Sequence, residues 1–221
     1  MKASKAQNFF SDGDKDRIRQ AVGKAEAMTS GEIATMIVDQ SDGYHDGEVL
    51  GSVIVAGMAA LIISAGVHYG GLSYHIPLDM TIWSYVPLVF ILYFPFRFIF
   101  SVIPWLKLPF INKNRIMNAV RDRAVRAFFE KRLYKTRDEN GILIFISLLE
   151  RKVWILGDRG IDTQIGNDTW MVMAREVSAG IGKGRGCDAL CSVIGQIGEL
   201  LARHFPRRSG DVNELTDELL L

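Results

Sequence analysis

The sequence predicts an α/β protein: a small sandwich with a central β-sheet, built from a strand, a crossover helix and a β-hairpin, flanked by helices and interrupted by a two-helix transmembrane hairpin. Two long apolar runs in the middle of the 221-residue chain predict the transmembrane hairpin. Short β-branched runs on both sides of it predict the strands, and amphipathic runs predict the helices. The expected segments are the first part of the α/β domain (1–47), the hairpin (48–106), the second part of the α/β domain (107–205) and a C-terminal tail (206–221).

The N-terminal segment predicts a capped helix and then a buried strand. Ser11 and Asp14 precede the amphipathic run IRQAVGKAEAM, and such side chains accept hydrogen bonds from the free N–H groups of a first helical turn. The turn-forming residues TSG end this helix near Met28. Residues 31–40, GEIATMIVDQ, are mostly apolar or β-branched between turn formers, which is typical of a buried strand. The acidic link SDGYHDGE then leads into the apolar segment.

The first apolar run, 49–67, contains no Asp, Glu, Lys or Arg and is long enough to cross the hydrocarbon layer of about 30 Å as a helix. The second run, 80–106, has Trp83 and Tyr85 near one end, where aromatic side chains favour the membrane interface. Its two prolines predict a kink that neighbouring groups accommodate. The alternative is a pair of core helices, but the rest of the chain is too small to enclose both.

The distribution of positive charge predicts the orientation of the hairpin. The loop HYGGLSYHIPLD contains no Lys or Arg, whereas Lys107, Lys113 and Arg115 follow the second run. Positive flanks stay in the cytoplasm, so both soluble parts are expected there. Arg97 is expected at the cytoplasmic interface with a snorkelling side chain, and residues 96–110 partly along the membrane surface. An intramembrane functional arginine is the alternative.

The second soluble part predicts a helix, a β-hairpin and two further helices. Residues 114–136 repeat apolar side chains close to the helical period and carry a basic outer face. Two β-rich runs, GILIFISLLE and KVWILGDRGI, are separated by so few residues that they predict a β-hairpin with its bend at 150–152. The later helices are expected over 162–181 and 187–204, joined by the glycine-rich GIGKGRG, with the tail extended or loosely docked.

Composition fits a globular protein with a small membrane segment: 48% of residues are hydrophobic, 23% are charged and the net charge is +1. Nucleic-acid binding is not indicated, because the basic residues belong to the soluble part and the membrane flank. The N-terminus lacks the apolar core of a secretory signal, so the first apolar run is expected to direct insertion. Cys187 and Cys191 are expected to be free, buried thiols that bind a metal only with further ligands nearby.

Three acidic residues form the candidate metal site. If the first strand is parallel to the second, the starts of both and the end of the third lie at one edge of the sheet. Glu32, Asp138 and Asp158 gather there, and Ca²⁺ or Mg²⁺ prefers such oxygen ligands. A bound ion could polarise a phosphoryl group and activate water. The alternative is structural, with Asp138 capping a turn and Asp158 paired with Arg137 or Arg159.

The spacing of the other motifs does not match a known catalytic or nucleotide-binding site. GIGKGRG follows no strand, and Val177 stands where a Walker loop needs glycine, so no nucleotide cofactor is expected. Its backbone amides could hold an anion. His45, near Asp42 and Asp46, could ligate a metal, but a solvated loop is the favoured interpretation. No Ser-His-Asp, Cys-His or paired-His zinc pattern is present.

Three segments resemble the TPM domain family: GEIATMIV at 31–38, the block NGILIFISLLERKVWILGDRGI at 140–161, and a closing helix ending HFP with NEL after it. The family is named after a thylakoid-lumen acid phosphatase, a photosystem repair protein and a modulator of nicotinic receptors. The resemblance implies a compact α/β domain attached to a membrane, with a role in membrane protein assembly or repair. It also implies divalent cation binding or phosphatase activity for some members. This chain differs by its hairpin after the first strand and by the predicted cytoplasmic location.

Two functions follow as expectations. The first is a multi-pass, membrane-anchored accessory module that binds the lipid bilayer and a membrane protein partner, together with a divalent cation. The second is a membrane-tethered, cation-dependent phosphatase or related hydrolase, for which the carboxylates and a nearby arginine would stabilise the transferred phosphoryl group. The catalytic residues, the partner and the oligomeric state do not follow from the sequence.

Overall fold

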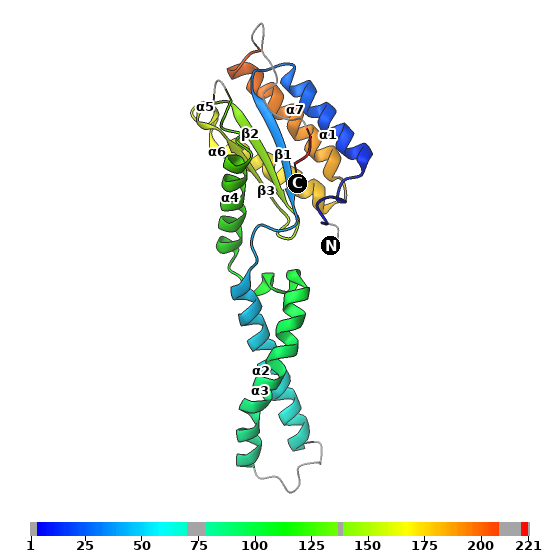
Figure 1. Cartoon of the computed structure of the whole chain (residues 1–221), viewed down its shortest axis with the longest axis vertical. Helices are drawn as coiled ribbons and strands as arrows, with labels where there is room; N and C mark the ends of the chain where they lie inside the picture. Colours follow the sequence, from blue (N-terminus) through cyan, green and yellow to red (C-terminus); the bar gives the residue numbers. More distant parts are fainter. Residues whose placement is uncertain (1–3, 70–77, 137–138, 208–217, 221) are drawn as a thin grey trace. The chain divides into compact units, whose positions relative to one another are not determined.

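The computed structural model describes residues 4–69, 78–136, 139–207 and 218–220. It divides the chain into two compact units, 1–42 with 116–221, and 43–115. The first unit contains α1 (Asp12–Glu26), β1 (Glu32–Val38), most of α4 (Lys113–Glu130), β2 (Gly141–Ser147), β3 (Lys152–Gly157), α5 (Arg159–Asp162), α6 (Asn167–Gly182) and α7 (Gly186–His204). The second contains α2 (His45–Tyr69), α3 (Leu78–Val102) and the 3₁₀ turns η1 (Pro104–Leu106) and η2 (Leu108–Phe110) (Figure 1).

In the described residues the sheet has three strands in the order β1-β2-β3. β1 is parallel to β2, with Glu32 opposite Gly141, and β2 is antiparallel to β3, with Ile142 opposite Gly157. These pairings confirm the predicted mixed α/β class, the parallel first pair and the β-hairpin. Residues from before and after α2 and α3 therefore form one sheet.

Helices cover both faces of this sheet (Figure 1). On one face, Ile142, Ile144 and Ile146 of β2 belong to a core completed by α1, α6 and α7. On the other face, Leu143 and Phe145 pack with side chains of α4. Every residue of β2 is buried, as expected for a central strand with both faces covered.

The helix boundaries both confirm and correct the expectations. The Ser11 side chain accepts from the Asp14 backbone N–H, and the Asp14 carboxylate accepts from Ser11 N–H in return, so the predicted cap of α1 is confirmed. The prediction of an acidic link over 41–48 is wrong for its second half, because α2 already begins at His45. α4 ends at Glu130 rather than near residue 136. The single helix expected over 162–181 is wrong at its start.

Two short segments replace the start of that helix. α5 ends at Asp162, and Gly166, with an extended backbone, forms the N-cap of α6. The chain therefore turns between the two helices rather than continuing through them. The last described residues dock on β1: Leu220 N–H donates to Thr35 O at 2.8 Å, and Ile37 N–H donates to Leu220 O at 3.0 Å. Leu220 thus occupies the side of β1 opposite β2.

Two helices of the described residues are long and apolar enough to cross a membrane. The spans His45–Val67 and Trp83–Val102 have mean hydropathies of 2.2 and 1.8. α3 is continuous through Pro87, Pro95 and Arg97, so residues 96–102 are helical. The 3₁₀ turns η1 and η2 follow.

A buried ion pair joins the start of α2 to the segment after α3. Lys107 Nζ lies 2.9 Å from Glu48 Oε2, and both side chains are 8% exposed. The same ammonium donates to Gly43 O at 3.2 Å. Arg97 and His45 add positive or titratable groups at 3.7 Å from the Glu48 carboxylate. These contacts hold the start of α2 against the end of α3 and the segment after it.

The Lys107→Met substitution should destabilise the helix pair, because it leaves the buried Glu48 carboxylate without its closest cation. We expect a loss of about 3 kcal/mol, seen as a lower Tm of the detergent-purified chain. The double variant with Glu48→Gln should recover part of this loss. Lys113→Met, at an exposed position, is the matched control. Equal Tm values for Lys107→Met and Lys113→Met would contradict the role of the ion pair.

Thr35 offers a second stability test, because its Oγ1 is buried in β1 without a hydrogen-bond partner. Thr35→Val removes this unsatisfied hydroxyl and keeps the side-chain shape. We expect a gain of about 1 kcal/mol and a Tm higher by about 2–4 °C. Thr163→Val is the control, since the Thr163 hydroxyl donates to Gly160 O. A lower Tm for Thr35→Val would show that the hydroxyl is satisfied in solution.

Candidate functional site

The predicted carboxylates were expected at one edge of the sheet, and two of them can be placed. Glu32 opens β1 opposite Gly141, the first residue of β2. Asp158 follows β3, and its backbone N–H donates to Gly141 O at 2.8 Å. Glu32 and Asp158 therefore flank the start of β2, which confirms the strand arrangement that the hypothesis needed. Asp138 and Arg137 lie outside the described residues.

Asp158 has two different carboxylate oxygens. Oδ1 accepts a hydrogen bond of 2.7 Å from Arg159 N–H and caps α5. Oδ2 is buried and has no hydrogen-bond partner among the described residues. Burial raises the pKa of the Asp158 carboxyl above its usual value, the Arg159 N–H opposes this shift, and the negative charge of Glu139 adds to it. The site thus favours a proton or another positive species next to Asp158.

Asp162 extends the negative region. Burial raises the pKa of its carboxyl, and the charge of Asp158 raises it further. Glu139 is tied to the same place through its backbone, because Gly160 N–H donates to Glu139 O at 3.1 Å. Glu139 before β2, Asp158 after β3 and Asp162 at the end of α5 therefore place negative charge close to Asp158.

The loop before β2 is held firmly against the first strand. Asn140 is 3% exposed, and its side-chain amide donates to Ser30 O at 2.5 Å. Its backbone carbonyl accepts from Glu32 N–H at 3.2 Å. Gly141 has no room for a side chain, since a Cβ would lie 2.5 Å from Leu133 O. These contacts fix the start of β2, which lies between the backbones of Glu32 and Asp158.

Glu32 and Asp158 offer oxygen ligands for a hard cation, but the described residues do not form a complete set of ligands. No group of three or more His, Cys, Asp or Glu side chains within those ranges has an arrangement that would hold a metal ion. Glu32 is 6% exposed, and Asp158 contributes one uncommitted oxygen. The cation site at Glu32, Asp138 and Asp158 therefore stays a prediction.

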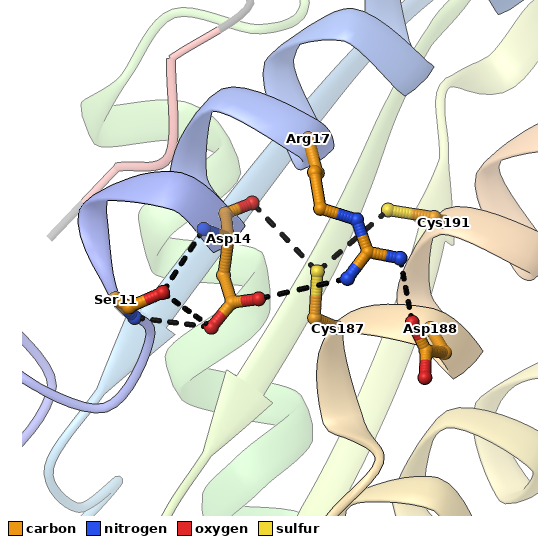
Figure 2. Close-up of polar contacts among 6 residues, drawn as sticks. All are labelled: Ser11, Asp14, Arg17, Cys187, Asp188 and Cys191. Carbon is orange, nitrogen blue, oxygen red and sulfur yellow. Dashed lines mark hydrogen bonds and ion pairs between the residues drawn. The ribbon is translucent and has the colours of Figure 1, made fainter.

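The two cysteines lie in a polar cluster between α1 and α7 (Figure 2). Their sulfur atoms are 4.0 Å apart, and Cys187 Sγ is 3.7 Å from Asp14 O. Both thiols are free, as expected, and Cys187 is buried whereas Cys191 is half-buried. Burial and the neighbouring Cys191 raise the pKa of Cys187 to about 12. Cys187 therefore stays protonated at neutral pH and is a poor nucleophile.

Arg17 explains the remaining contacts of this cluster. Its guanidinium lies 2.6 Å from Asp188 Oδ1 and 3.7 Å from Asp14 Oδ1, which links α1 to the first turn of α7 (Figure 2). The bond to Asp188 raises the pKa of Arg17, which keeps the guanidinium charged. The cluster fastens two helices together, and no periodicity in the sequence could have shown a pair 171 residues apart.

The other residues named in the sequence analysis lie in helices or turns with ordinary structural roles. His45 lies in the first turn of α2 rather than in a loop, and its Nδ1 is 3.7 Å from Glu48 Oε2. His204 ends α7. The GIGKGRG segment contains the turn between α6 and α7, where Gly184 has φ of +71°. The positive φ explains a glycine at this position.

A groove that the sequence analysis missed runs along β3. It has a volume of about 760 Å³ and lies between α4 and α6, with residues 152–155 of β3 along it. We call it the β3 groove. Trp154 and Trp170 line it together with Arg121 and Arg175. Lys152 and Trp154 are two residues apart in the sequence, which places both on one face of a strand. Only the order of the strands shows that β3 forms an edge.

A search against protein-family models finds no match, and a search of curated proteins finds none either. Among solved structures, the chain is similar to the NMR structure of BA42 protein from the psychrophilic bacterium Bizionia argentinensis. The sequences are 19% identical, and the match covers 96% of this chain and 94% of that chain with a TM-score of 0.58. At this identity, the likeness supports the fold and carries no information about activity.

Asp158→Asn tests the carboxylate edge through stability. The raised pKa means that the folded state binds the proton of Asp158 more tightly than the unfolded state does. The stability that this proton contributes is complete below the unfolded pKa of about 3.8 and is lost as the pH rises through the folded pKa. At neutral pH, the charged Asp158 therefore opposes folding. Without divalent cations, Asp158→Asn should therefore raise the Tm at pH 7. Ca²⁺ or Mg²⁺ should raise the Tm of the original protein and leave that of Asp158→Asn unchanged.

Asp16→Asn serves as the control, because Asp16 is exposed on α1. Its Tm should respond to cations as the original protein does. Identical cation responses of the original protein and Asp158→Asn would remove Asp158 from the site.

Proposed function

We propose that this chain is a membrane-anchored accessory module of the TPM type, in which α2 and α3 cross the bilayer and the α/β unit binds a partner protein and a divalent cation. The observation that carries the proposal is the exposure of the two apolar helices. In the hydrophobic windows of α2 and α3, only 22% and 6% of the residues are buried. Lipid would cover the remainder.

Large exposed side chains concentrate on these helices. Leu61 and Ile62 of α2 are 61% and 70% exposed, and Phe90 and Phe98 of α3 are 68% and 71% exposed. A core helix of a soluble protein would bury such residues, since each buried side chain of this kind contributes about 1.5–3 kcal/mol. Insertion in a bilayer accounts for them without a second protein.

The cytoplasmic location of the α/β unit is part of the proposal. It is supported by Lys107 and Arg115 after α3 and by the lack of Lys and Arg between the two apolar runs. Glu48 and Lys107 support the same arrangement, since they form an ion pair at one end of the helix pair, where charged groups reach the interface. The segments at 31–38 and 140–161 that resemble the TPM family lie in β1 and from β2 to α5, and the closing helix is α7, all in the α/β unit; NEL at 213–215 lies outside the described residues.

A membrane-tethered, cation-dependent phosphatase is the second candidate. The observation in its favour is the group of interacting carboxylates around Asp158, because raised pKa values often mark functional sites. Arg159 is the nearest candidate for stabilising a phosphoryl group. Binding ranks first, because phosphoryl transfer needs positioned positive charge as well as carboxylates.

Membrane anchoring is tested with charges placed on the exposed apolar faces. The unmodified chain should remain with membranes after alkaline extraction. The double variant Leu61→Lys/Phe90→Lys should be released or fail to insert, because each lysine costs about 3 kcal/mol at the centre of a membrane helix. Phe129→Lys, equally exposed on α4, should behave like the unmodified chain. Release of the unmodified chain as a soluble monodisperse protein would refute the anchor.

The two candidate functions are separated by an enzyme assay. The detergent-purified full chain is incubated with a generic phosphate ester, with and without Mg²⁺ or Ca²⁺. The accessory-module proposal predicts hydrolysis at background level in all samples. Cation-dependent hydrolysis that is lost in Asp158→Asn and kept in Asp16→Asn would establish the phosphatase instead.

A further inference from the structure

We propose that the β3 groove binds an extended acidic segment of the partner protein, which adds a strand to the open edge of the sheet. This inference rests on the proposed binding function and names the chemistry of the partner. It comes from three properties of the described residues: an edge strand, a basic rim and an apolar floor.

The first property is the edge of β3. β3 is the last strand of the order β1-β2-β3, so its outer backbone groups have no strand beside them in the described part of the chain. The opposite edge is occupied, since Leu220 exchanges two backbone hydrogen bonds with β1. This sheet therefore already accepts a short extended segment at one edge. An added strand gains its affinity from the same type of backbone hydrogen bond.

The second property is charge. Arg121 of α4, Lys152 of β3 and Arg175 of α6 line the groove, and no Asp or Glu lines it. Arg121 also approaches the exposed carboxylate of Asp122, at 3.4 Å. Lys152 and Arg175 have no ion pair with any residue whose position is described. The groove thus carries positive charge that an acidic segment would complement.

Lys152 also argues against a second copy of this chain as the occupant. A second copy would bring the three basic side chains of one groove, Arg121, Lys152 and Arg175, against the same three of the other, and such facing of like charges is unfavourable. An acidic partner removes this penalty.

The third property is the apolar floor. Trp154 of β3 lies in the groove with Met117 of α4 and Met171 of α6, and the two methionines are 39% and 46% exposed. Flexible methionines adapt to different apolar side chains. Alternate side chains of an added strand point to opposite faces, so one set can meet the apolar floor while the other meets the basic rim.

Trp170 supplies an additional polar group. It lines the groove and is 4% exposed, yet its indole N–H has no hydrogen-bond partner in the part of the chain that the structure describes. Buried indole N–H groups usually find an acceptor. A backbone carbonyl of the bound segment supplies one after a small side-chain movement. Ser178, which donates to Arg151 O at 2.9 Å, fixes α6 against the β2–β3 turn and so defines one end of the groove.

The test uses the detergent-purified full chain and a fluorescein-labelled peptide of alternating Glu and Val residues, with fluorescence anisotropy as the readout. The peptide should bind in a saturable and salt-sensitive manner. Arg175→Glu and Arg121→Glu should each weaken binding roughly tenfold or more, because they place like charges beside the peptide. Arg126→Glu is the matched control, since Arg126 is exposed on α4 and does not line the groove.

Two changes of the probe separate strand addition from other modes of binding. A peptide of alternating Lys and Val should not bind. N-methylation of alternate backbone amides of the Glu-Val peptide should abolish binding in one of the two possible registers, because it removes the donors that pair with β3. These probe changes do not alter the protein, so its folding is not in question.

Several results would overturn the inference. Binding that survives N-methylation in both registers would exclude strand addition. Equal affinities of Arg175→Glu, Arg121→Glu and Arg126→Glu would place the peptide elsewhere. Binding of myristate that is lost in Arg175→Glu, without any binding of the peptide, would assign the groove to an anionic amphiphile. Each result leaves membrane anchoring untouched, since alkaline extraction tests the anchor and the phosphate-ester assay tests catalysis independently of the groove.

Discussion

The parallel pairing of β1 with β2 is the constraint on which the rest of this structure depends. The strands come from opposite sides of the apolar helix pair, and parallel strands need a crossover between them. Here the crossover contains α2, α3 and α4. The cost of closing so long a connection falls if its ends are held together, and the contact of Lys107 with Glu48 and Gly43 does this inside the helix pair. The ion pair thus brings the start of α2 close to the segment that follows α3.

Most of the sheet could be predicted from the sequence, because its strands are short apolar runs between turn formers and the Ser11 cap has a local signature. The start of α2 could not, since Asp46 and Glu48 suit both an acidic loop and the first turn of a helix, where the dipole favours them. The break between α5 and α6 was missed because a helical period continues across it. For the candidate site, the shared edge of Glu32 and Asp158 followed from strand directions, whereas the β3 groove depends on the packing of three separate elements.

The carboxylate edge and the β3 groove show different physical signs of function. Around Asp158, burial and like charges raise pKa values, so the edge lowers stability at neutral pH unless a cation or proton compensates. In the groove, three basic side chains surround apolar side chains at the edge strand of the described sheet, and Lys152 and Arg175 have no ion pair with a described residue. The first arrangement suits a small cation and the second a peptide.

Residue-resolved hydrogen exchange of the full chain in lipid nanodiscs tests most directly whether one sheet is assembled across a bilayer-inserted helix pair. The account predicts that amides of β1 and β2 open with a common free energy, because neither strand persists without the other. It also predicts that the apolar spans of α2 and α3 are strongly protected in the lipid. Fast, independent exchange of β1 while β2 stays protected, or unprotected spans in the nanodisc, would contradict it.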